Sequence, residues 1–242
     1  MSETMIHSEE NGEVLLLDKP LDWTSFDVVK RIRWAFKVAK AGHAGTLDPR
    51  ATGLLIVCTG KKTKTIDQFV GLEKEYIGTF ELGIRTASFD SETEISERKP
   101  YDAVTLERIN EEIRQFLGKS FQVPPMYSAV KHHGKPLYKY ARRGKEIARE
   151  PKEIDIKEFE VTAFHSPQVE FRVVCSKGTY IRSLVDDLGQ RLGCGAMLSS
   201  LRRTRIGQYH VRDAMTVEQL ENARRTSVSK DSRIAHESRL PA

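Results

Sequence analysis

The sequence predicts an α+β protein built around a mostly antiparallel mixed sheet that is flanked by helices. Strand-like runs and helical segments alternate irregularly, without the βαβ regularity of a parallel sheet. Hydrophobic residues make up 39% of the 242 residues, which is enough for a substantial core. No repeat or low-complexity linker interrupts residues 13–222. We therefore expect one domain at 13–222, between a polar tail at 1–12 and a polar, disordered tail at 223–242.

The first third of the chain predicts two strands and two helices around one loop. Residues 14–17 form a short apolar run, and Thr24 or Ser25 can cap a helix. That helix has its apolar residues at helical spacing, namely Val28, Val29, Ile32 and Phe36. We expect next a glycine-rich loop at 42–53, a strand at 54–58 and a helix at about 63–70.

The rest of the chain predicts further strands and three more helices. Residues 75–82 alternate, so that Tyr76, Phe80 and Leu82 share one face. After it we expect a loop at 86–99, a helix from Thr105 to a terminating Gly118, and short strands and turns at 121–151. Paired strands at 154–164 and 169–175 and a helix at 180–192 come next. Strands at 196–211 and a last helix, whose capping box is Thr216 with Gln219, complete the expected elements.

Basic residues are clustered along the chain. Lys and Arg number 39 against 34 acidic residues, which gives a net charge of +5. The basic clusters lie at 30–33, 61–64, 131–135, 141–145 and 201–205, whereas acidic residues concentrate at 89–97. Such segregation favours a basic face that binds a polyanion over a set of ordinary solvated helix faces.

Several classes of protein do not fit the sequence. No apolar run reaches the roughly 20 residues of a membrane span, and the polar N-terminus does not resemble a secretory signal. The three cysteines form no CxxC pair, which favours buried, reduced thiols in a cytoplasmic protein. Motifs for nucleotide cofactors, zinc deaminases and α/β-hydrolases are missing. The adjacent pair His132-His133 is expected to be a polar turn, so we expect neither a cofactor nor a metal.

The stretch GHAGTLDPRATG at 42–53 contains one carboxylate, Asp48, directly before a buried strand. Aspartate before proline is a common turn former, which is the simplest interpretation of Asp48. The three glycines, however, allow the backbone to approach a ligand closely, and the strand fixes the position of the loop. Asp48 is therefore a candidate nucleophile or base.

Two further residues are candidates for the same site. Arg182 lies in the first turn of an apolar helix, where it can pair with a carboxylate or remain an exposed helix residue. Tyr76 lies on the apolar face of its strand, where it either packs in the core or stacks on a nucleobase.

Four stretches, GHAGTLDPRATGLL, KEYIGTFELG, PPMYSAVKHHGKPLYKYAR and CSKGTYIRSLVDDLG, closely resemble the TruB-type bacterial tRNA pseudouridine synthases. The resemblance runs from about Val14 to Val211. It implies a pseudouridine-synthase fold and a cofactor-independent isomerase that converts uridine 55 in the T-loop of tRNA to pseudouridine. It also implies that the partner is the T-arm of tRNA. The sequence itself gives no oligomeric state, and we expect a monomer. The longer relatives carry a C-terminal PUA domain, and because the pattern stops near Glu221 we expect that domain to be absent.

The resemblance assigns roles to residues of this chain. Asp48 matches the catalytic aspartate, Tyr76 the tyrosine that stacks on the target base and Arg182 the arginine that pairs with the aspartate. The substrate-binding residues implied in the same way are His43, Lys19, Tyr180, Leu201 and Lys64. Attack by Asp48 at ribose C1′ and addition to the uracil ring both remain open.

Two other functions fit parts of the sequence. A catalytically silent RNA-binding module would use the same basic clusters, but it would not need Asp48, Tyr76 and Arg182 together. A hydrolase would pair Asp48 with a second acid. No second carboxylate occupies a comparable loop, and we expect Asp186 to face solvent.

Overall fold

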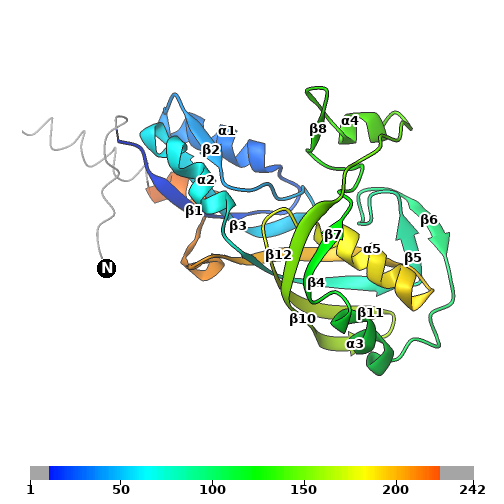
Figure 1. The fold of residues 1–242 in the computed structure, drawn as a ribbon. Coiled ribbons are helices and arrows are strands. Elements are labelled where there is room, and N and C mark those ends of the chain that lie inside the picture. Colours follow the sequence, from blue (N-terminus) through cyan, green and yellow to red (C-terminus); the bar gives the residue numbers. More distant parts are fainter. Residues whose placement is uncertain (1–10, 224–242) are drawn as a thin grey trace, which may run out of the picture. The chain divides into compact units, whose positions relative to one another are not determined.

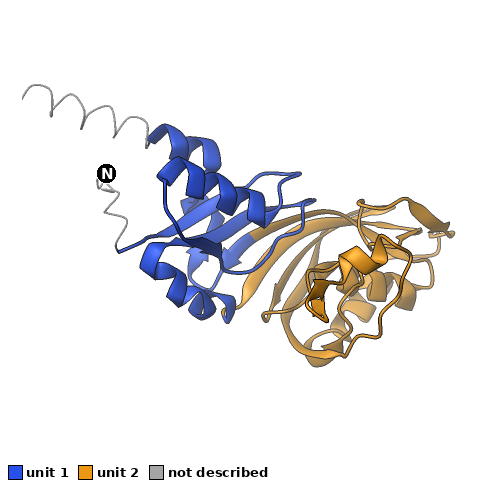
Figure 2. Cartoon of the chain, turned by 90° about the horizontal axis from the view of Figure 1, so that it is seen from above, with its two compact units in different colours: residues 1–71, 204–242 blue, residues 72–203 orange. Residues whose placement is uncertain are grey.

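The computed structural model describes residues 11–223, and the chain folds into two compact units (Figure 2). Unit 1 combines the segment before Leu72 with the segment after Arg203, and unit 2 is Leu72–Arg203. Each unit contains a sheet and helices, which confirms the predicted α+β class. The tails expected at 1–12 and 223–242 lie almost entirely outside the described residues and stay predictions.

The sheet of unit 1 is built from β1 (Val14–Lys19) and β3 (Ala51–Thr59), which run antiparallel. β2 (Ala41–His43) pairs with β3, and the short β14 (Met215–Thr216) adds a parallel pairing to β1. α1 (Ser25–Phe36) packs against β2 and β3 (Figure 1). The core cluster here contains Leu17, Val28, Val29, Ile32, Phe36, Leu55, Val57, Val217 and Leu220. The helical spacing of the apolar residues in α1 therefore predicted its buried face correctly.

The ends of the helices in unit 1 follow from local side-chain chemistry. Thr24 caps α1 through a capping box with Asp27, and Lys37 ends the helix in the left-handed conformation. The predicted helix at 63–70 is instead a 3₁₀ turn, η1 (Gly60–Thr65), followed by the short α2 (Ile66–Val70). β13 (Tyr209–His210) and the 3₁₀ turn η2 (Val211–Asp213) precede β14. The expected capping box is present, because Gln219 N donates to Thr216 Oγ1 and Thr216 N donates to Gln219 Oε1.

The sheet of unit 2 has the strand order β12, β4, β11, β10, β7. The bounds are β4 (Lys74–Leu82), β7 (Gly118–Gln122), β10 (Lys152–His165), β11 (Gln168–Cys175) and β12 (Ala196–Ile206), whose end continues into unit 1. α3 (Leu106–Arg114) packs against β10 and α5 (Ile181–Leu192). The predicted hairpin around Ser166-Pro167 is confirmed by the antiparallel β10–β11 pairing.

The alternation predicted for β4 is confirmed. Tyr76, Phe80 and Leu82 are buried, whereas Ile77 is 41% exposed. A Cβ atom at Gly78 would lie 2.5 Å from Ser200 O, so only glycine allows the two backbones to approach this closely.

Two expectations for unit 2 are corrected. The acidic stretch is not a continuous loop, because β6 (Ile95–Arg98) pairs with β5 (Ile84–Thr86). The residues of β6 are mostly exposed, so backbone pairing rather than an apolar period defines the strand. α3 ends at Arg114, and Gly118, with a φ of 87°, begins β7 instead of terminating the helix.

A small hairpin follows β7. β8 (Lys131–His132) pairs with β9 (Lys135–Pro136), and α4 (Tyr138–Ala141) comes next. His133 has a φ of 47°, which confirms the predicted turn at the histidine pair.

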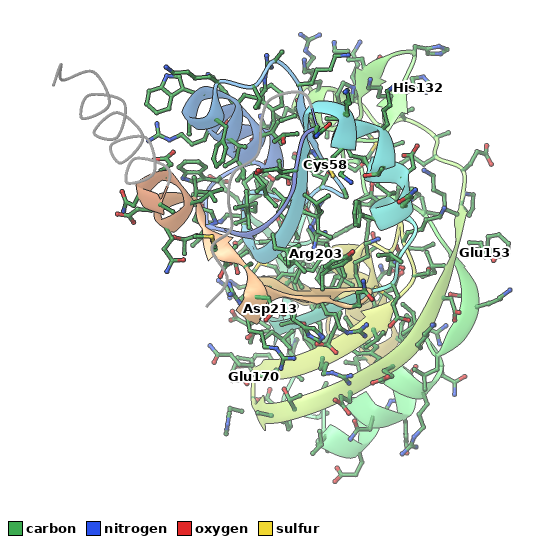
Figure 3. The ribbon with its side chains drawn as sticks, turned by 90° about the vertical axis from the view of Figure 1, so that its left-hand side faces the viewer. Cys58, His132, Glu153, Glu170, Arg203 and Asp213 are labelled. Atoms are coloured by element: carbon green, nitrogen blue, oxygen red, sulfur yellow. The ribbon has the colours of Figure 1, made fainter. Side chains whose placement is uncertain are left out.

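The three cysteines are buried and unbridged. Cys58 lies on β3 (Figure 3). Burial raises the pKa of Cys175 to about 12. The helices of the described part are all too short or too polar to cross a membrane.

Candidate functional site

The glycine-rich loop of unit 1 holds Asp48 in a fixed, half-buried position between β2 and β3. On one side of Asp48, Leu47 N donates to Ser25 Oγ at 2.8 Å and Ser25 Oγ donates to Leu47 O at 3.1 Å. On the other side, Asp22 N donates to Pro49 O at 2.9 Å. The backbone on both sides of Asp48 is therefore anchored to residues that begin or precede α1.

Lys19 is the interior support of this loop. Its side chain is fully buried, and Nζ donates to Trp23 O at 2.5 Å, to Pro20 O at 2.8 Å and to Pro49 O at 3.4 Å. Burial of a charge is costly unless hydrogen bonds compensate it, and three carbonyl oxygens do so here. The ammonium thus ties the loop to the chain between β1 and α1.

Two glycines give the loop a path that other residues rarely adopt. Gly45 and Gly53 have φ angles of 102° and 101°, in the region that favours glycine. His43 ends β2 opposite Val57, directly before the loop. Lys64 lies elsewhere in unit 1, exposed on η1.

Unit 2 carries the candidate base-stacking residue. Tyr76 lies on β4 opposite Val173 of β11 and is 8% exposed. A ring fixed by a central strand in this way has few alternative rotamers available.

Arg182 is deeply buried in the first turn of α5, with 3% exposure. Its guanidinium donates to Ser88 O at 2.9 Å and to Tyr127 O at 2.7 Å. Nε lies 3.4 Å from Oδ2 of Asp90, which is also buried. The alternative of an exposed helix arginine is therefore wrong. Asp48 belongs to the other unit, and its pairing with Arg182 stays a prediction.

Asp90 was missed by the sequence analysis. Its side chain also accepts from Glu92 N at 2.9 Å, and its backbone oxygen accepts from Thr86 Oγ1 at 2.7 Å. The surrounding acidic stretch looked like a solvated loop, which concealed one buried carboxylate. Phe89 is an apolar neighbour of Asp90 and was the only local signal that this part of the acidic stretch is buried. Phe89 adopts a positive φ of 65°.

Tyr180 and Leu201 also belong to unit 2, where Tyr180 directly precedes α5 and Leu201 lies on β12. The side chain of Gln122 forms two hydrogen bonds with the backbone of Tyr180. Tyr180 N donates to Gln122 Oε1 at 2.8 Å, and Gln122 Nε2 donates to Tyr180 O at 3.0 Å. This pair of bonds fixes the start of α5. Leu201 is half-buried on β12.

Asp186 does not face solvent as expected, because it is buried on α5. Its carboxylate accepts from Arg85 Nε at 2.9 Å and from Arg85 Nη2 at 3.2 Å, and Gln190 donates to it at 2.6 Å. A partner from β5, which the sequence did not place next to α5, explains this burial. The pair is a structural anchor of α5, the helix that carries Arg182.

The basic clusters differ in exposure. Residues 61, 62 and 64 are exposed in unit 1, and residues 131, 139, 142, 143 and 145 are exposed in unit 2. In the latter region Lys135 lies 5.1 Å from the Tyr140 ring and Arg142 lies 5.4 Å from the Tyr138 ring. Arg203 is 1% exposed, so the cluster at 201–205 contributes less to a basic surface than expected.

Comparison with known proteins gives consistent matches along the chain. Residues 33–181 match the TruB family pseudouridylate synthase N-terminal domain, and residues 182–236 match the tRNA pseudouridylate synthase B C-terminal domain. The tRNA pseudouridine synthase B of Chlorobium luteolum is 53% identical over 86% of this chain and 74% of that protein. The corresponding protein of Chloroherpeton thalassium is 50% identical over 87% of this chain and 89% of that protein.

Solved structures agree in fold. A chain of a Cbf5-Nop10-Gar1 complex has a TM-score of 0.69 and 32% identity over 88% of this chain. A chain of an H/ACA RNP bound to a substrate RNA containing 2′-deoxyuridine has a TM-score of 0.64 and 28% identity over 86% of this chain. This chain spans about half the length of each, 54% and 52%.

Proposed function

Because this chain belongs to the TruB family of pseudouridylate synthases, we propose that it converts uridine 55 in the T-loop of tRNA to pseudouridine. The tRNA substrate is supported by relatives about 50% identical that are named tRNA pseudouridine synthase B. The observation that carries the proposal is the loop that presents Asp48, anchored on both sides by Ser25, Asp22 and Lys19.

The reaction is an isomerisation, so the atomic composition of the nucleotide does not change. The C1′–N1 glycosidic bond breaks, the uracil rotates, a C1′–C5 bond forms, and the proton on C5 leaves while N1 gains one. No redox change occurs, so side chains alone can supply the chemistry.

Asp48 acts as the nucleophile. A nucleophile must be held within a narrow range of positions relative to the bond that breaks. The hydrogen bonds at Leu47 and Pro49 hold the backbone on either side of Asp48, so the loop that carries the carboxylate does not have to be ordered when substrate arrives.

The target uridine must leave its stack to reach a carboxylate, which costs a few kcal/mol. Tyr76 offsets this cost by stacking on the extruded uracil, and Leu201 and Tyr180 supply the remaining surface of the base pocket. His43 supports the extruded conformation of the T-loop.

Positively charged side chains make up the rest of the proposed site. Arg182 is held as a cation by two carbonyl oxygens and Asp90, and we propose that it keeps the carboxylate of Asp48 ionised. Lys64 and the exposed basic residues beside Tyr138 and Tyr140 bind tRNA phosphates. We expect the protein to act as a monomer in the cytoplasm.

A second candidate function, a catalytically silent RNA-binding module, is favoured by one observation. The basic side chains packed on Tyr138 and Tyr140 suit RNA binding whether or not chemistry follows.

The test uses an unmodified tRNA transcript and a matched transcript in which cytidine replaces uridine 55. We expect pseudouridine at position 55 of the first transcript, none in the second, and no free uracil from either. Binding without pseudouridine would favour the silent module, pseudouridine elsewhere in the transcripts would refute the assigned position, and free uracil would indicate a hydrolase.

A further inference from the structure

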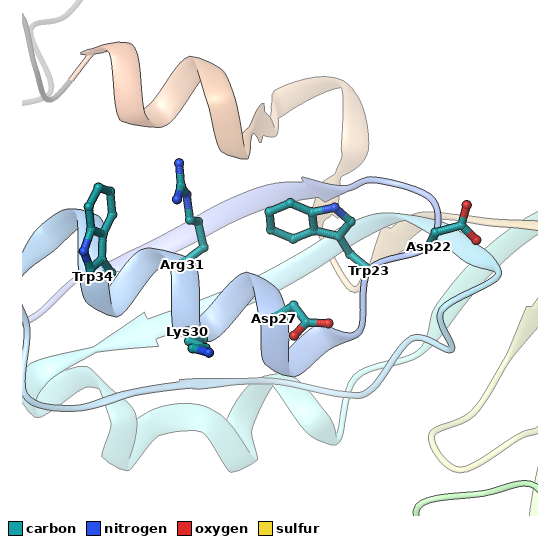
Figure 4. A pocket seen from close by; sticks show the side chains of 6 residues that line it. All are labelled: Asp22, Trp23, Asp27, Lys30, Arg31 and Trp34. Carbon is teal, nitrogen blue, oxygen red and sulfur yellow. The ribbon is translucent and has the colours of Figure 1, made fainter.

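α1 contributes to a pocket in unit 1 that the proposed reaction does not use. The pocket has a volume of about 470 Å³ and is lined by Asp22, Trp23, Asp27, Lys30, Arg31 and Trp34 (Figure 4). The sequence contains two tryptophans, and both line this pocket. Concentration of the largest aromatic side chains in one pocket points to recognition of a flat ligand.

The two tryptophans differ in how they are held. Trp23 is partly buried and packs against the core cluster of unit 1. Trp34 is 67% exposed, and the guanidinium of Arg31 lies 4.8 Å from its ring. Exposure of so much indole surface is unfavourable in the free protein, and such surfaces commonly mark binding sites.

Most charged residues of the pocket have partners in the protein. Arg31 forms two hydrogen bonds with Glu221, on the helix that begins at Val217. Asp22 pairs with Arg50 at 2.8 Å, and Asp27 belongs to the capping box of α1.

Lys30 differs from these residues. Within residues 11–223 it is exposed and forms no salt bridge, and the exposed Arg33 and Lys37 follow it on α1. Lys30 acts electrostatically on Asp27 of the same pocket, and the exposed Arg33 and Lys37 add positive charge beyond it, which suits an anionic ligand.

We propose that this pocket holds one unpaired nucleotide of the RNA substrate, with its base stacked on Trp34 and its phosphate beside Lys30. Aromatic rings next to cations are the chemistry that binds unpaired nucleotides, because every base has a stacking face and every linkage carries a phosphate. The identity of the RNA rests on the proposed function, whereas the pocket chemistry does not.

The pocket is joined to the loop that presents Asp48. Asp22 N donates to Pro49 O, and Lys19 Nζ donates to both Trp23 O and Pro49 O. A nucleotide in the pocket is consequently bound by the same hydrogen-bonded assembly that positions Asp48. Binding there adds affinity for the substrate without entering the chemical step.

The two tryptophans make the test direct, because fluorescence excited selectively from tryptophan comes only from side chains that line this pocket. We expect an unmodified tRNA transcript to quench the fluorescence of the wild-type chain with the Kd that filter binding gives. Trp34→Ala should raise that Kd by about 5- to 100-fold, the range expected for loss of one stacking platform. Its kcat at saturating tRNA should remain that of the wild type. Trp34→Phe, which keeps a stacking ring, should restore most of the affinity.

Phe26→Ala is the matched control, because Phe26 is 66% exposed on the same helix but does not line the pocket. It should leave the Kd unchanged. Saturating tRNA that leaves the fluorescence unchanged, or a Trp34→Ala variant with the wild-type Kd, would overturn the inference while pseudouridine formation still supports the proposed function. Quenching and the Trp34→Ala defect without pseudouridine would support the pocket and overturn the reaction.

Discussion

Asp90→Asn is expected to destabilise unit 2 because it removes the carboxylate beside the buried cation of Arg182. Both side chains are almost fully buried, with 3% exposure for Arg182 and 5% for Asp90, and Nε of Arg182 lies 3.4 Å from Oδ2 of Asp90. Asparagine has nearly the same shape, so the hydrogen bond from Glu92 N can persist. The perturbation is therefore the loss of one negative charge, together with an amide donor in the place where Oδ2 faces Arg182 Nε.

The expected cost follows from the burial of the pair. Removal of one partner of a buried ion pair costs about 3–5 kcal/mol, because the other charge remains without compensation. Two carbonyl oxygens still bind Arg182, so we expect the lower end, about 3 kcal/mol. For a chain of this size that corresponds to a fall in Tm of roughly 6–12 °C.

The assay is thermal and urea unfolding of the wild type, Asp90→Asn, Arg182→Met and the double variant. The double variant should lose less stability than the sum of the single losses, because it leaves no isolated buried charge. Asp90→Asn should also reduce pseudouridine formation in the native state at 25 °C. Wild-type stability in Asp90→Asn, or strictly additive losses in the double variant, would refute the assignment of Asp90 as the partner of Arg182.

Three more predictions address single positions. Tyr76→Leu should lower turnover far more than stability, and proportionate losses in both would mean that the ring serves only the core. Gly189→Ala should destabilise the protein by about 1–3 kcal/mol or more, since its Cβ would lie 2.1 Å from Ala196 N; an unchanged Tm would contradict this close approach. Lys74 is buried, which lowers its pKa from 10.5 in the unfolded chain to about 8 in the folded protein. Between pH 8 and 10.5, Lys74 therefore keeps its proton in the unfolded chain but loses it in the folded protein. The stability of the wild type should therefore rise relative to Lys74→Met from pH 8 to 10.5, by up to about 3 kcal/mol, and parallel pH curves would contradict the lowered pKa.

The fold was predictable where local pattern and burial agree. The apolar residues of α1 and the alternation of β4 have the period of their elements, so the sequence identified which side chains are buried. The residues of β6 are mostly exposed, and only its pairing with β5 makes it a strand. No local sequence pattern therefore predicted β6.

The candidate site was predictable in its residues but not in its partners. The loop around Asp48 and the first turn of α5 are marked by glycines and by an arginine in an apolar helix. Asp90 and Asp186, however, are buried because Arg182 and Arg85 come from distant segments. Sequence spacing contains no information on such long-range pairs, and a carboxylate without a visible partner looks solvent-exposed.

The most direct test of the central claim follows tritium release from C5 of the labelled uridine at position 55, with wild type and Asp48→Asn in parallel. Binding of the same RNA is measured by filter retention, so that chemistry and affinity are separated. The account predicts release of tritium and formation of pseudouridine by the wild type, and no release by Asp48→Asn at an unchanged Kd. Release by Asp48→Asn at the wild-type rate would contradict the assignment of Asp48 as the nucleophile.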